Sequence, residues 1–276
     1  MKCAWQQLIS ILPMSLRADV DKQQKDLQEI RLRLGKPPEL VCHSRRILLQ
    51  KPVTEGELTF VVNTASRYSP WISVTTAAGY IAAPGGHRIG LCGSAVIKDG
   101  QMTGLRALQS INIRVARDLP GCSGTLGQIK GSILIIGKPG SGKTTLLRDL
   151  IRQRSANENI GVVDQRGELF PEGSAFDTGQ HTDVLSGCAK GEGIEILLRT
   201  MTPDTIAVDE ITAPSDCDAL MHAGWCGTAL LATAHASGRE DLLQRPLYKV
   251  LAKSGLFDHL VILHSDKTWH KERMIQ

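Results

Sequence analysis

A glycine-rich string between an apolar strand and a run of helix-forming residues is the part of this sequence most suited to chemistry. Residues 137–144 read Gly-Lys-Pro-Gly-Ser-Gly-Lys-Thr and match the phosphate-binding pattern G-x-x-x-x-G-K-[ST]. Glycines let backbone N–H groups converge on phosphate oxygens, and the following helix presents the positive end of its dipole. The predicted phosphate-binding residues are Gly137, Lys138, Pro139, Gly140, Ser141, Gly142, Lys143, Thr144 and Thr145.

Three side chains at the end of this string have distinct predicted roles. Lys143 should reach the β- and γ-phosphates of a nucleoside triphosphate, and the hydroxyl of Thr144 should take one coordination position of Mg²⁺. Thr145 either helps to begin the helix or contacts the α-phosphate. The string therefore predicts that the chain binds ATP together with Mg²⁺.

An acidic pair follows a second apolar strand, residues 205–208. Parallel sheets place their ligand crevice at the carboxyl ends of the strands, so Asp209 and Glu210 are expected to face the phosphates. Asp209 would hold the Mg²⁺ shell, and Glu210 would act as general base toward the attacking water. Taken alone, such a pair would as readily mark the start of a helix. The phosphate-binding loop in the same chain favours the metal-binding and catalytic interpretation.

A second acidic turn, residues 163–168, follows the next strand after the phosphate-binding helix. It too would face the crevice. Asp164 and Glu168 can hold water that is bound to Mg²⁺ or that attacks the phosphate, and Arg166 can bind a phosphate or pair with a neighbouring carboxylate. The alternative is a charged loop closed by an internal salt bridge.

Two histidines have settings that suggest a role. The strand at residues 229–232 leads into Thr-Ala-His235, where a polar side chain can hydrogen-bond the γ-phosphate and report whether it is present. A lone histidine more often has a structural role, but its place after the other boxes favours the sensor interpretation. For His87, in the sequence Gly-Gly-His-Arg, a hairpin turn is an equal alternative.

The elements that must position these groups alternate regularly in the C-terminal half. Strand-sized apolar runs alternate with helical stretches, which is typical of a mostly parallel sheet covered on both faces. The runs are residues 133–136, 160–163, 205–208, 229–232 and 260–263. The predicted fold class is therefore α/β, and with the phosphate-binding string among these elements residues 131–276 resemble a RecA-like P-loop nucleoside triphosphatase core.

The preceding residues predict a smaller α+β domain, residues 1–117. An amphipathic helix from Trp5 to Leu12 opens it, and a second helix begins at a capping box formed by Thr54 and Glu57. The predicted strands are residues 29–34, 40–42, 47–49, 80–83, 88–97 and 111–116. A loop rich in Gly, Pro and Ser makes residues 118–130 the predicted linker.

Composition excludes several classes of protein. The sequence is 42% hydrophobic and 22% charged, near the globular average, and no apolar run approaches the roughly 18 residues of a membrane-spanning helix. The N-terminus lacks the continuous apolar stretch of a signal peptide, so a cytoplasmic protein is predicted. The seven cysteines are scattered without a C-x-x-C pair, which argues against a disulfide framework or a zinc site.

The net charge of +4 is unevenly distributed. Residues 1–130 hold 17 Lys/Arg against 9 Asp/Glu, and residues 131–276 hold 15 against 19, so the two parts carry +8 and −4. This asymmetry can serve nucleic acid, a membrane surface or contact between subunits, or it can be ordinary solvated surface. Only 4% of the residues are aromatic, which argues against nucleic acid as a partner because few rings can stack on bases.

The order of the four boxes resembles that of the secretion ATPases of the type II, type IV and pilus-retraction kind. Further segments narrow the resemblance, over about residues 29–264, to the stage III sporulation AA family. These are GGHRIGL at residues 85–91, INIRVAR at 111–117 and RTMTPD at 199–204. The sequence departs from the family at Gln165 and Thr212, where Glu and Gly are common.

The resemblance implies an ATP-hydrolysing motor that is cytoplasmic, peripheral to the membrane and assembled as a hexameric ring of identical subunits. It also implies that the motor acts in the mother cell on an integral-membrane channel component and energises a mother cell–forespore channel. Such a ring takes a cation from the neighbouring subunit, and the candidates are Arg88, Arg106, Arg114 and Arg117. The alternatives are a nucleic-acid translocase on the same core and an ATP-binding scaffold that does not hydrolyse.

Overall fold

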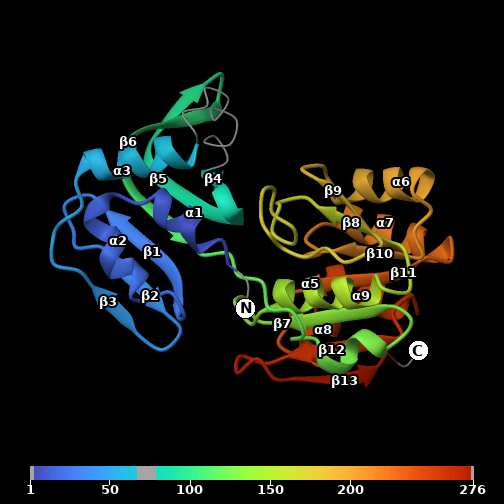
Figure 1. Cartoon of the computed structure of the whole chain (residues 1–276). Helices are drawn as coiled ribbons and strands as arrows, with labels where there is room; N and C mark the ends of the chain where they lie inside the picture. Colours follow the sequence, from blue (N-terminus) through green and yellow to red (C-terminus); the bar gives the residue numbers. More distant parts are fainter. Residues whose placement is uncertain (1–2, 67–78, 275–276) are drawn as a thin grey trace. The chain divides into compact units, whose positions relative to one another are not determined.

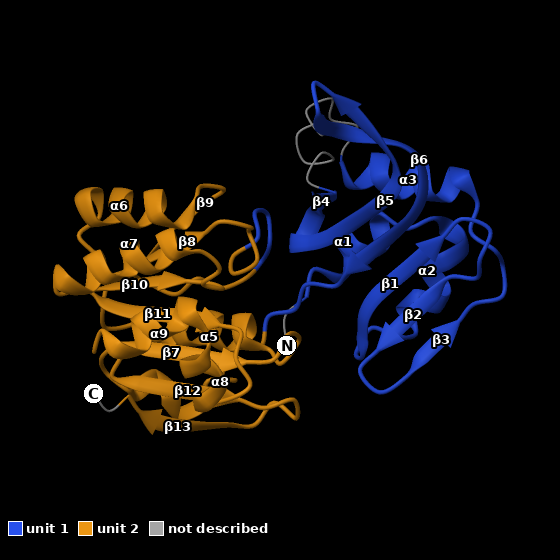
Figure 2. Ribbon diagram, turned by 180° about the vertical axis from the view of Figure 1, so that it is seen from behind, with its two compact units in different colours: residues 1–118, 171–175 blue, residues 119–170, 176–276 orange. Residues whose placement is uncertain are grey.

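The computed structural model describes residues 3–66 and 79–274, and the chain forms two compact units (Figure 1, Figure 2). The N-terminal unit comprises Met1–Asp118 with Pro171–Ala175, and the core unit comprises Leu119–Phe170 with Phe176–Gln276. Residues 119–130, most of the predicted linker, are thus packed with the core unit. No helix among the described residues is long and apolar enough to cross a membrane.

The N-terminal unit is an antiparallel sheet with helices against it. Its strands are β1 (Leu27–Arg33), β2 (Glu39–Cys42), β3 (Arg46–Leu48), β4 (Tyr80–Ala83), β5 (His87–Lys98) and β6 (Gln101–Arg114), in the spatial order β3-β2-β1-β6-β5-β4. Its helices are α1 (Trp5–Ser10), α2 (Met14–Asp21) and α3 (Glu55–Ala65). Alternate residues of β1 are buried against the helices in one hydrophobic cluster, as the period of a half-buried strand requires.

Two details of this unit differ from the prediction. The expected first helix, Trp5 to Leu12, ends at Ser10 as α1, and the helix α2, which had not been predicted, begins directly after Pro13, since a proline without an N–H fits before a helix better than inside one. Strand β6 begins at Gln101 rather than residue 111, since β5 and β6 form one long hairpin. Its turn is Asp99-Gly100, with both residues at positive φ, and an Asp-Gly pair is a strong hairpin signal that the prediction had missed.

His87, the first residue of β5, is buried and structural. Its Nδ1 accepts the backbone N–H of Ala116 (3.1 Å), and its Nε2 lies 3.2 Å from the carbonyl oxygen of Ala4. Because Nδ1 accepts, the ring proton is on Nε2, which donates to Ala4. The neutral imidazole thus links the chain at Ala4 to the chain at Ala116. Burial lowers the pKa of His87, which agrees with this neutral form.

The core unit is a seven-stranded sheet in the order β13-β12-β7-β11-β10-β8-β9. Its strands are β7 (Ile133–Gly137), β8 (Ile160–Asp164), β9 (Thr182–Ser186), β10 (Thr205–Val208), β11 (Ala229–Ala234), β12 (His259–Leu263) and β13 (Trp269–Arg273). All neighbouring pairs are parallel except β12 with the edge strand β13. The edge strands β9 and β13 had not been predicted.

Helices cover both faces of this sheet, which explains why its central strands are continuous apolar runs. One face packs against α5 (Lys143–Arg154) and the short 3-10 helix η3 (Gly124–Gln128). The other packs against α6 (Lys190–Thr200), α7 (Pro214–Trp225), α8 (Arg239–Gln244) and α9 (Pro246–Lys253). Because β7, β8, β10 and β11 are parallel, their carboxyl ends lie at the same edge of the sheet.

A buried carboxylate fastens residues 121–123 to helix α5. Asp149 Oδ1 accepts the N–H of Gly121 (2.8 Å), and Oδ2 accepts both the N–H and the hydroxyl of Ser123 (2.7 Å each). Arg152 and Gln153 donate to the same carboxylate from the helix itself. Burial alone raises the pKa of Asp149, but these hydrogen bonds outweigh it and bring the pKa to about 2.

We expect the contribution of Asp149 to stability to be lost in acid. The folded pKa lies below the unfolded value of 3.8, so the stabilisation is fully present above pH 3.8 and disappears as the pH falls toward 2. A shift of this size corresponds to roughly 2 kcal/mol. In urea titrations of Asp149→Asn and the unchanged protein, the difference in unfolding free energy should be large at pH 7 and narrow below pH 3.8; a constant difference contradicts this assignment.

Candidate active site

The phosphate-binding string forms a loop between β7 and α5 that favours glycine at three positions. Gly140 and Gly142 have φ values of 75° and 104°, a region that other residues rarely adopt. At Gly137 a Cβ would lie 2.6 Å from Ser141 Oγ and 2.7 Å from the Leu263 carbonyl oxygen, so a side chain does not fit there. The three positions explain the glycines of the motif by backbone conformation and close packing.

The loop also has the polar groups that a triphosphate requires. The N-cap residue of α5 is Gly142, which has no side chain to cap the helix, and this leaves backbone N–H donors of the first turn available to an anion. The hydroxyl oxygen of Ser141 is buried and has no hydrogen-bond partner among the described residues. Together with the buried ammonium of Lys143, these groups fit the phosphates of a nucleotide.

Lys143 and His235 are hydrogen-bonded to each other. The Lys143 ammonium donates to the carbonyl oxygens of Gly137 (3.0 Å) and Lys138 (3.2 Å) and lies 3.0 Å from His235 Nδ1. Since an ammonium only donates, Nδ1 of His235 accepts and Nε2 carries the ring proton. Burial lowers the pKa of Lys143, and the charges of Asp209 and Glu210 partly offset that effect.

The same histidine reaches the acidic pair. His235 Nε2 lies 3.0 Å from Glu210 Oε1, so the neutral ring donates to the carboxylate. Arg166 approaches the other oxygen of Glu210 at 3.6 Å. Glu210 is thus linked through His235 to the lysine of the phosphate-binding loop, and Arg166 faces it from the acidic turn.

Both carboxylate oxygens of Asp209 accept hydrogen bonds from threonine hydroxyl groups at the site. The hydroxyl of Thr144 donates to Asp209 Oδ2 (2.7 Å), which brings together the two side chains predicted to hold Mg²⁺. Thr233 donates to Asp209 Oδ1 (2.6 Å) and accepts the backbone N–H of Glu210 (2.8 Å). Glu210 has φ of 49°, a strained conformation for a non-glycine residue, and the bond from its N–H helps to hold it there.

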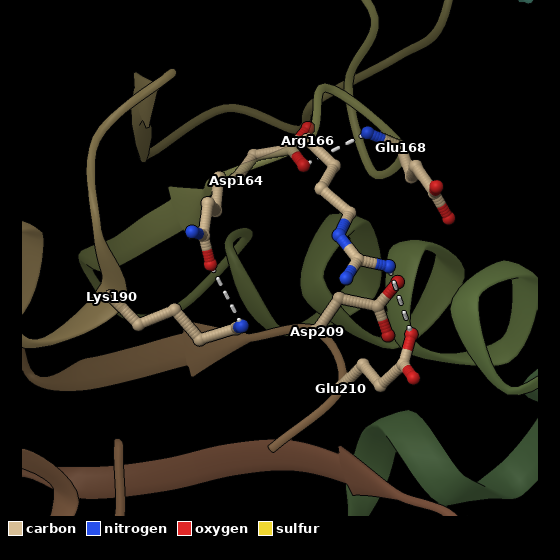
Figure 3. A pocket seen from close by; sticks show the side chains of 7 residues that line it. Asp164, Arg166, Glu168, Lys190, Asp209 and Glu210 are labelled. Carbon is tan, nitrogen blue, oxygen red and sulfur yellow. Dashed lines mark hydrogen bonds and ion pairs between the residues drawn. The ribbon is translucent and has the colours of Figure 1, made fainter. Parts of the chain in front are cut away.

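A pocket joins the acidic turn to the acidic pair, and Figure 3 shows Arg166 extending toward Asp209 and Glu210. It is lined by Asp164, Gln165, Arg166, Glu168, Lys190, Asp209 and Glu210. Lys190, at the start of α6, is a buried cation that donates to Gln165 Oε1 (3.0 Å) and lies 3.7 Å from Asp216. It connects the acidic turn to the start of α7.

The two carboxylates of the acidic turn differ in their surroundings. Asp164 is buried and accepts three backbone N–H groups, from Glu168, Leu169 and Phe170, so this geometry favours a turn-holding role over the expected contact with water. The backbone carbonyl oxygen of Glu168 accepts from Arg148 (2.8 Å), and its side chain lines the same pocket as Glu210. Because His235 links Glu210 to Lys143, Glu210 is the acidic group that this geometry favours as a general base.

The family model for "Sporulation stage III, protein AA" matches residues 3–275. Stage III sporulation protein AA of Bacillus subtilis is 33% identical over 283 residues, covering 95% of this chain and 91% of its own length. The chain belongs to the sporulation stage III AA family.

Solved structures place this family member in a known fold. An ATPase DotB of Yersinia pseudotuberculosis superposes with a TM-score of 0.65 at 14% identity, covering 96% of this chain and 79% of that one. The pilus retraction motor PilT, solved with bound ADP, gives 0.56 at 14% identity, covering 88% and 76%. The predicted fold, a RecA-like P-loop core with a smaller N-terminal α+β domain, is confirmed.

The structure brings together five residues that the sequence had singled out, and three further residues contact the same place. Lys143, Thr144, Asp209, Glu210 and His235 lie together, and their roles stay predictions. Lys190, Thr233 and Lys267 had not been assigned roles, although each contacts the site or its loop. Thr233 was recognisable, since its strand leads into His235, whereas nothing near Lys190 or Lys267 marks a site.

Proposed function

We propose that this chain hydrolyses ATP to ADP and phosphate and uses the energy as a motor of the secretion-ATPase kind. The observation that carries the proposal is the convergence of Lys143, the Thr144–Asp209 pair and Glu210 at one edge of a parallel sheet. The sporulation family and the fold support the same proposal. The two compact units correspond in this proposal to a partner-facing domain and an ATPase core.

The residues divide the reaction between them. Thr144 and Asp209 would hold Mg²⁺, which when bound supplies positive charge to the phosphate oxygens. Glu210 takes the proton of a water whose oxygen bonds to the γ-phosphorus, and the bond from that phosphorus to the β–γ bridging oxygen breaks to give ADP and phosphate. For this, Lys143 exchanges its backbone carbonyl partners for phosphate oxygens and releases Nδ1 of His235.

In the wider proposal the motor is a hexameric, membrane-peripheral ring of identical subunits in the cytoplasm of the mother cell. It acts on an integral-membrane channel component between mother cell and forespore. Membership of the sporulation stage III AA family supports this setting, and the charges of +8 and −4 on the two parts of the chain fit contact between neighbouring subunits.

Of the four candidate arginines, two are already engaged within their own subunit. Arg88 stacks on Tyr80 (3.9 Å to the ring centroid), and Arg117 donates to the carbonyl oxygens of Leu27 and Gln24. By contrast, Arg106 and Arg114 on β6 are exposed, and neither forms a side-chain hydrogen bond or ion pair within residues 3–66 and 79–274. We propose one of these two as the arginine finger supplied in trans.

This proposal predicts that specific ATPase activity rises with protein concentration as rings form. Arg106→Ala or Arg114→Ala should lower the plateau by about 10²-fold or more, because the finger stabilises charge in the transition state. Lys98→Ala, an exposed cation of the same hairpin, is the matched control. Subunits with Glu210→Gln, which keep the finger, should partly rescue the arginine variant on mixing; activity independent of concentration, with no rescue, excludes a finger in trans.

One assay separates the proposed function from its alternatives. ATPase activity is measured with the purified chain alone, with single-stranded DNA and with anionic liposomes. A membrane-peripheral motor predicts hydrolysis that liposomes increase and DNA leaves unchanged, whereas stimulation by DNA supports a translocase. Binding of Mg-ATP without turnover in any condition supports a scaffold and overturns the proposal.

A further inference from the structure

The turn between β12 and β13 lies beside the phosphate-binding loop. Strand β12 pairs with β7 in parallel, with Leu263 opposite Gly137, so both strands end at the same edge of the sheet. The chain then reverses within residues 264–268, where the N–H of His264 donates to the Thr268 carbonyl oxygen (2.9 Å). The turn therefore emerges next to the residues that begin the loop.

The backbone of this turn is held in a specific conformation. Asp266 Oδ1 accepts the N–H (3.0 Å) and the hydroxyl (2.7 Å) of Thr268, and the N–H of Lys267 donates to the His264 carbonyl oxygen (3.1 Å). Lys267 has φ of 71°, a left-handed conformation that costs free energy for a residue with a side chain. The turn thus keeps a lysine where a glycine or asparagine would be favoured.

The side chain of Lys267 is bound to the phosphate-binding loop. Its ammonium donates to the carbonyl oxygens of Gly140 (2.7 Å) and Ser141 (3.0 Å). A Cβ built on Gly142 would lie 4.0 Å from the Lys267 nitrogen, which places the ammonium beside all three residues. Lys267 is therefore a lysine bound to the loop from a segment far away in the sequence.

These contacts bear on the direction of the loop's N–H groups. In a trans peptide the C=O and the following N–H point in opposite directions. A cation that holds the Ser141 carbonyl therefore turns the N–H of Gly142 away from itself, at the start of α5. The N–H of Ser141 is engaged by the Lys138 carbonyl oxygen (3.1 Å), so the 141–142 peptide is the one that Lys267 can orient for a ligand.

We propose that Lys267 is a positioning residue for the triphosphate: it holds the 141–142 peptide so that the N–H of Gly142 faces the phosphates, and it adds positive charge to the loop. The proposal rests on the proposed nucleotide site. Because the same orientation serves the bound substrate and the transition state, loss of Lys267 should weaken binding more than it slows turnover.

The test compares four variants of the full-length chain. Lys267→Met removes the donors and the charge at similar length, Lys267→Gln keeps an N–H donor, Lys267→Arg keeps donors and charge, and Lys271→Met removes an exposed lysine of β13. KM and kcat for ATP hydrolysis, the Kd of Mg-ATP and the Tm with and without nucleotide are measured for each.

For Lys267→Met we expect KM and Kd to rise about 10-fold while kcat changes less than about 2-fold, with the nucleotide-free Tm unchanged. Lys267→Arg should restore both constants, Lys267→Gln should fall between, and Lys271→Met should match the unchanged chain. The inference is overturned if KM and Kd of Lys267→Met equal those of the unchanged chain, whether or not Tm and kcat fall. If the unchanged chain itself binds no Mg-ATP, the proposed function fails as well, which distinguishes the two failures.

Discussion

Lys143→Ala is expected to lose at least about 10²-fold in affinity for Mg-ATP, roughly 3 kcal/mol, which is within the cost of removing one partner of a buried charge pair. The Lys143 ammonium is buried, and it is hydrogen-bonded to two loop carbonyl groups and His235. An alanine leaves the phosphates without that charge. Equilibrium titration with a fluorescent ATP analogue measures the loss directly.

Lys138→Ala is the matched control for this experiment. Lys138 lies in the same loop, but its side chain is exposed, so solvent screens its charge and the change in Kd should be small. The Tm of both variants is compared with that of the unchanged protein, since Lys143 also packs within the loop. A Kd for Lys143→Ala equal to that of Lys138→Ala would show that this loop does not hold phosphates as proposed.

Glu210→Gln should retain nucleotide binding while turnover falls by about 10²-fold or more, the scale of a lost general base. The amide oxygen of glutamine can still accept from His235 Nε2, which now lies 3.0 Å from Glu210 Oε1, so the side chain can stay in place. The substitution thus removes the basicity and little else. Steady-state kcat and the Kd of Mg-ATP, measured on one preparation, separate the two effects.

Glu168→Gln provides the comparison that assigns the base. Glu168 lines the same pocket, but Glu210 is the carboxylate that His235 links to Lys143, so the Glu168 variant should keep most of its activity. The reverse result, full turnover in Glu210→Gln and loss in Glu168→Gln, would move the general base to the acidic turn. Loss in both variants would mean that the two carboxylates share the task.

The parts of the site that were predictable from sequence are those carried by contiguous residues or by strand ends. The phosphate-binding loop is a string whose glycines follow from local backbone geometry. Asp209 and His235 follow β10 and β11, and parallel strands bring their carboxyl ends to one edge whatever their order. The architecture of the core unit was also predictable, because parallel strands that are buried on both faces appear in the sequence as continuous apolar runs.

The residues that sequence reasoning missed depend on the order of the strands. Lys267 reaches the loop because β12 is the neighbour of β7, and Lys190 faces the acidic turn because α6 begins beside β8; neither adjacency is encoded locally. The edge strands were missed because they are only partly buried and lack an apolar run. The tautomer of His235 required the distance to an ammonium, which no sequence pattern supplies.

The attachment of residues 121–123 to Asp149 determines how this segment exchanges hydrogen with solvent. The amide hydrogens of Gly121 and Ser123 are bound to a carboxylate of helix α5, so they exchange when the segment detaches from that helix. Because α5 begins at the phosphate-binding loop, these two amides report local opening of the helix that carries Lys143 and Thr144. Deuterium uptake at this segment, measured with and without added Mg-ATP, is thereby a label-free record of how tightly the helix is held.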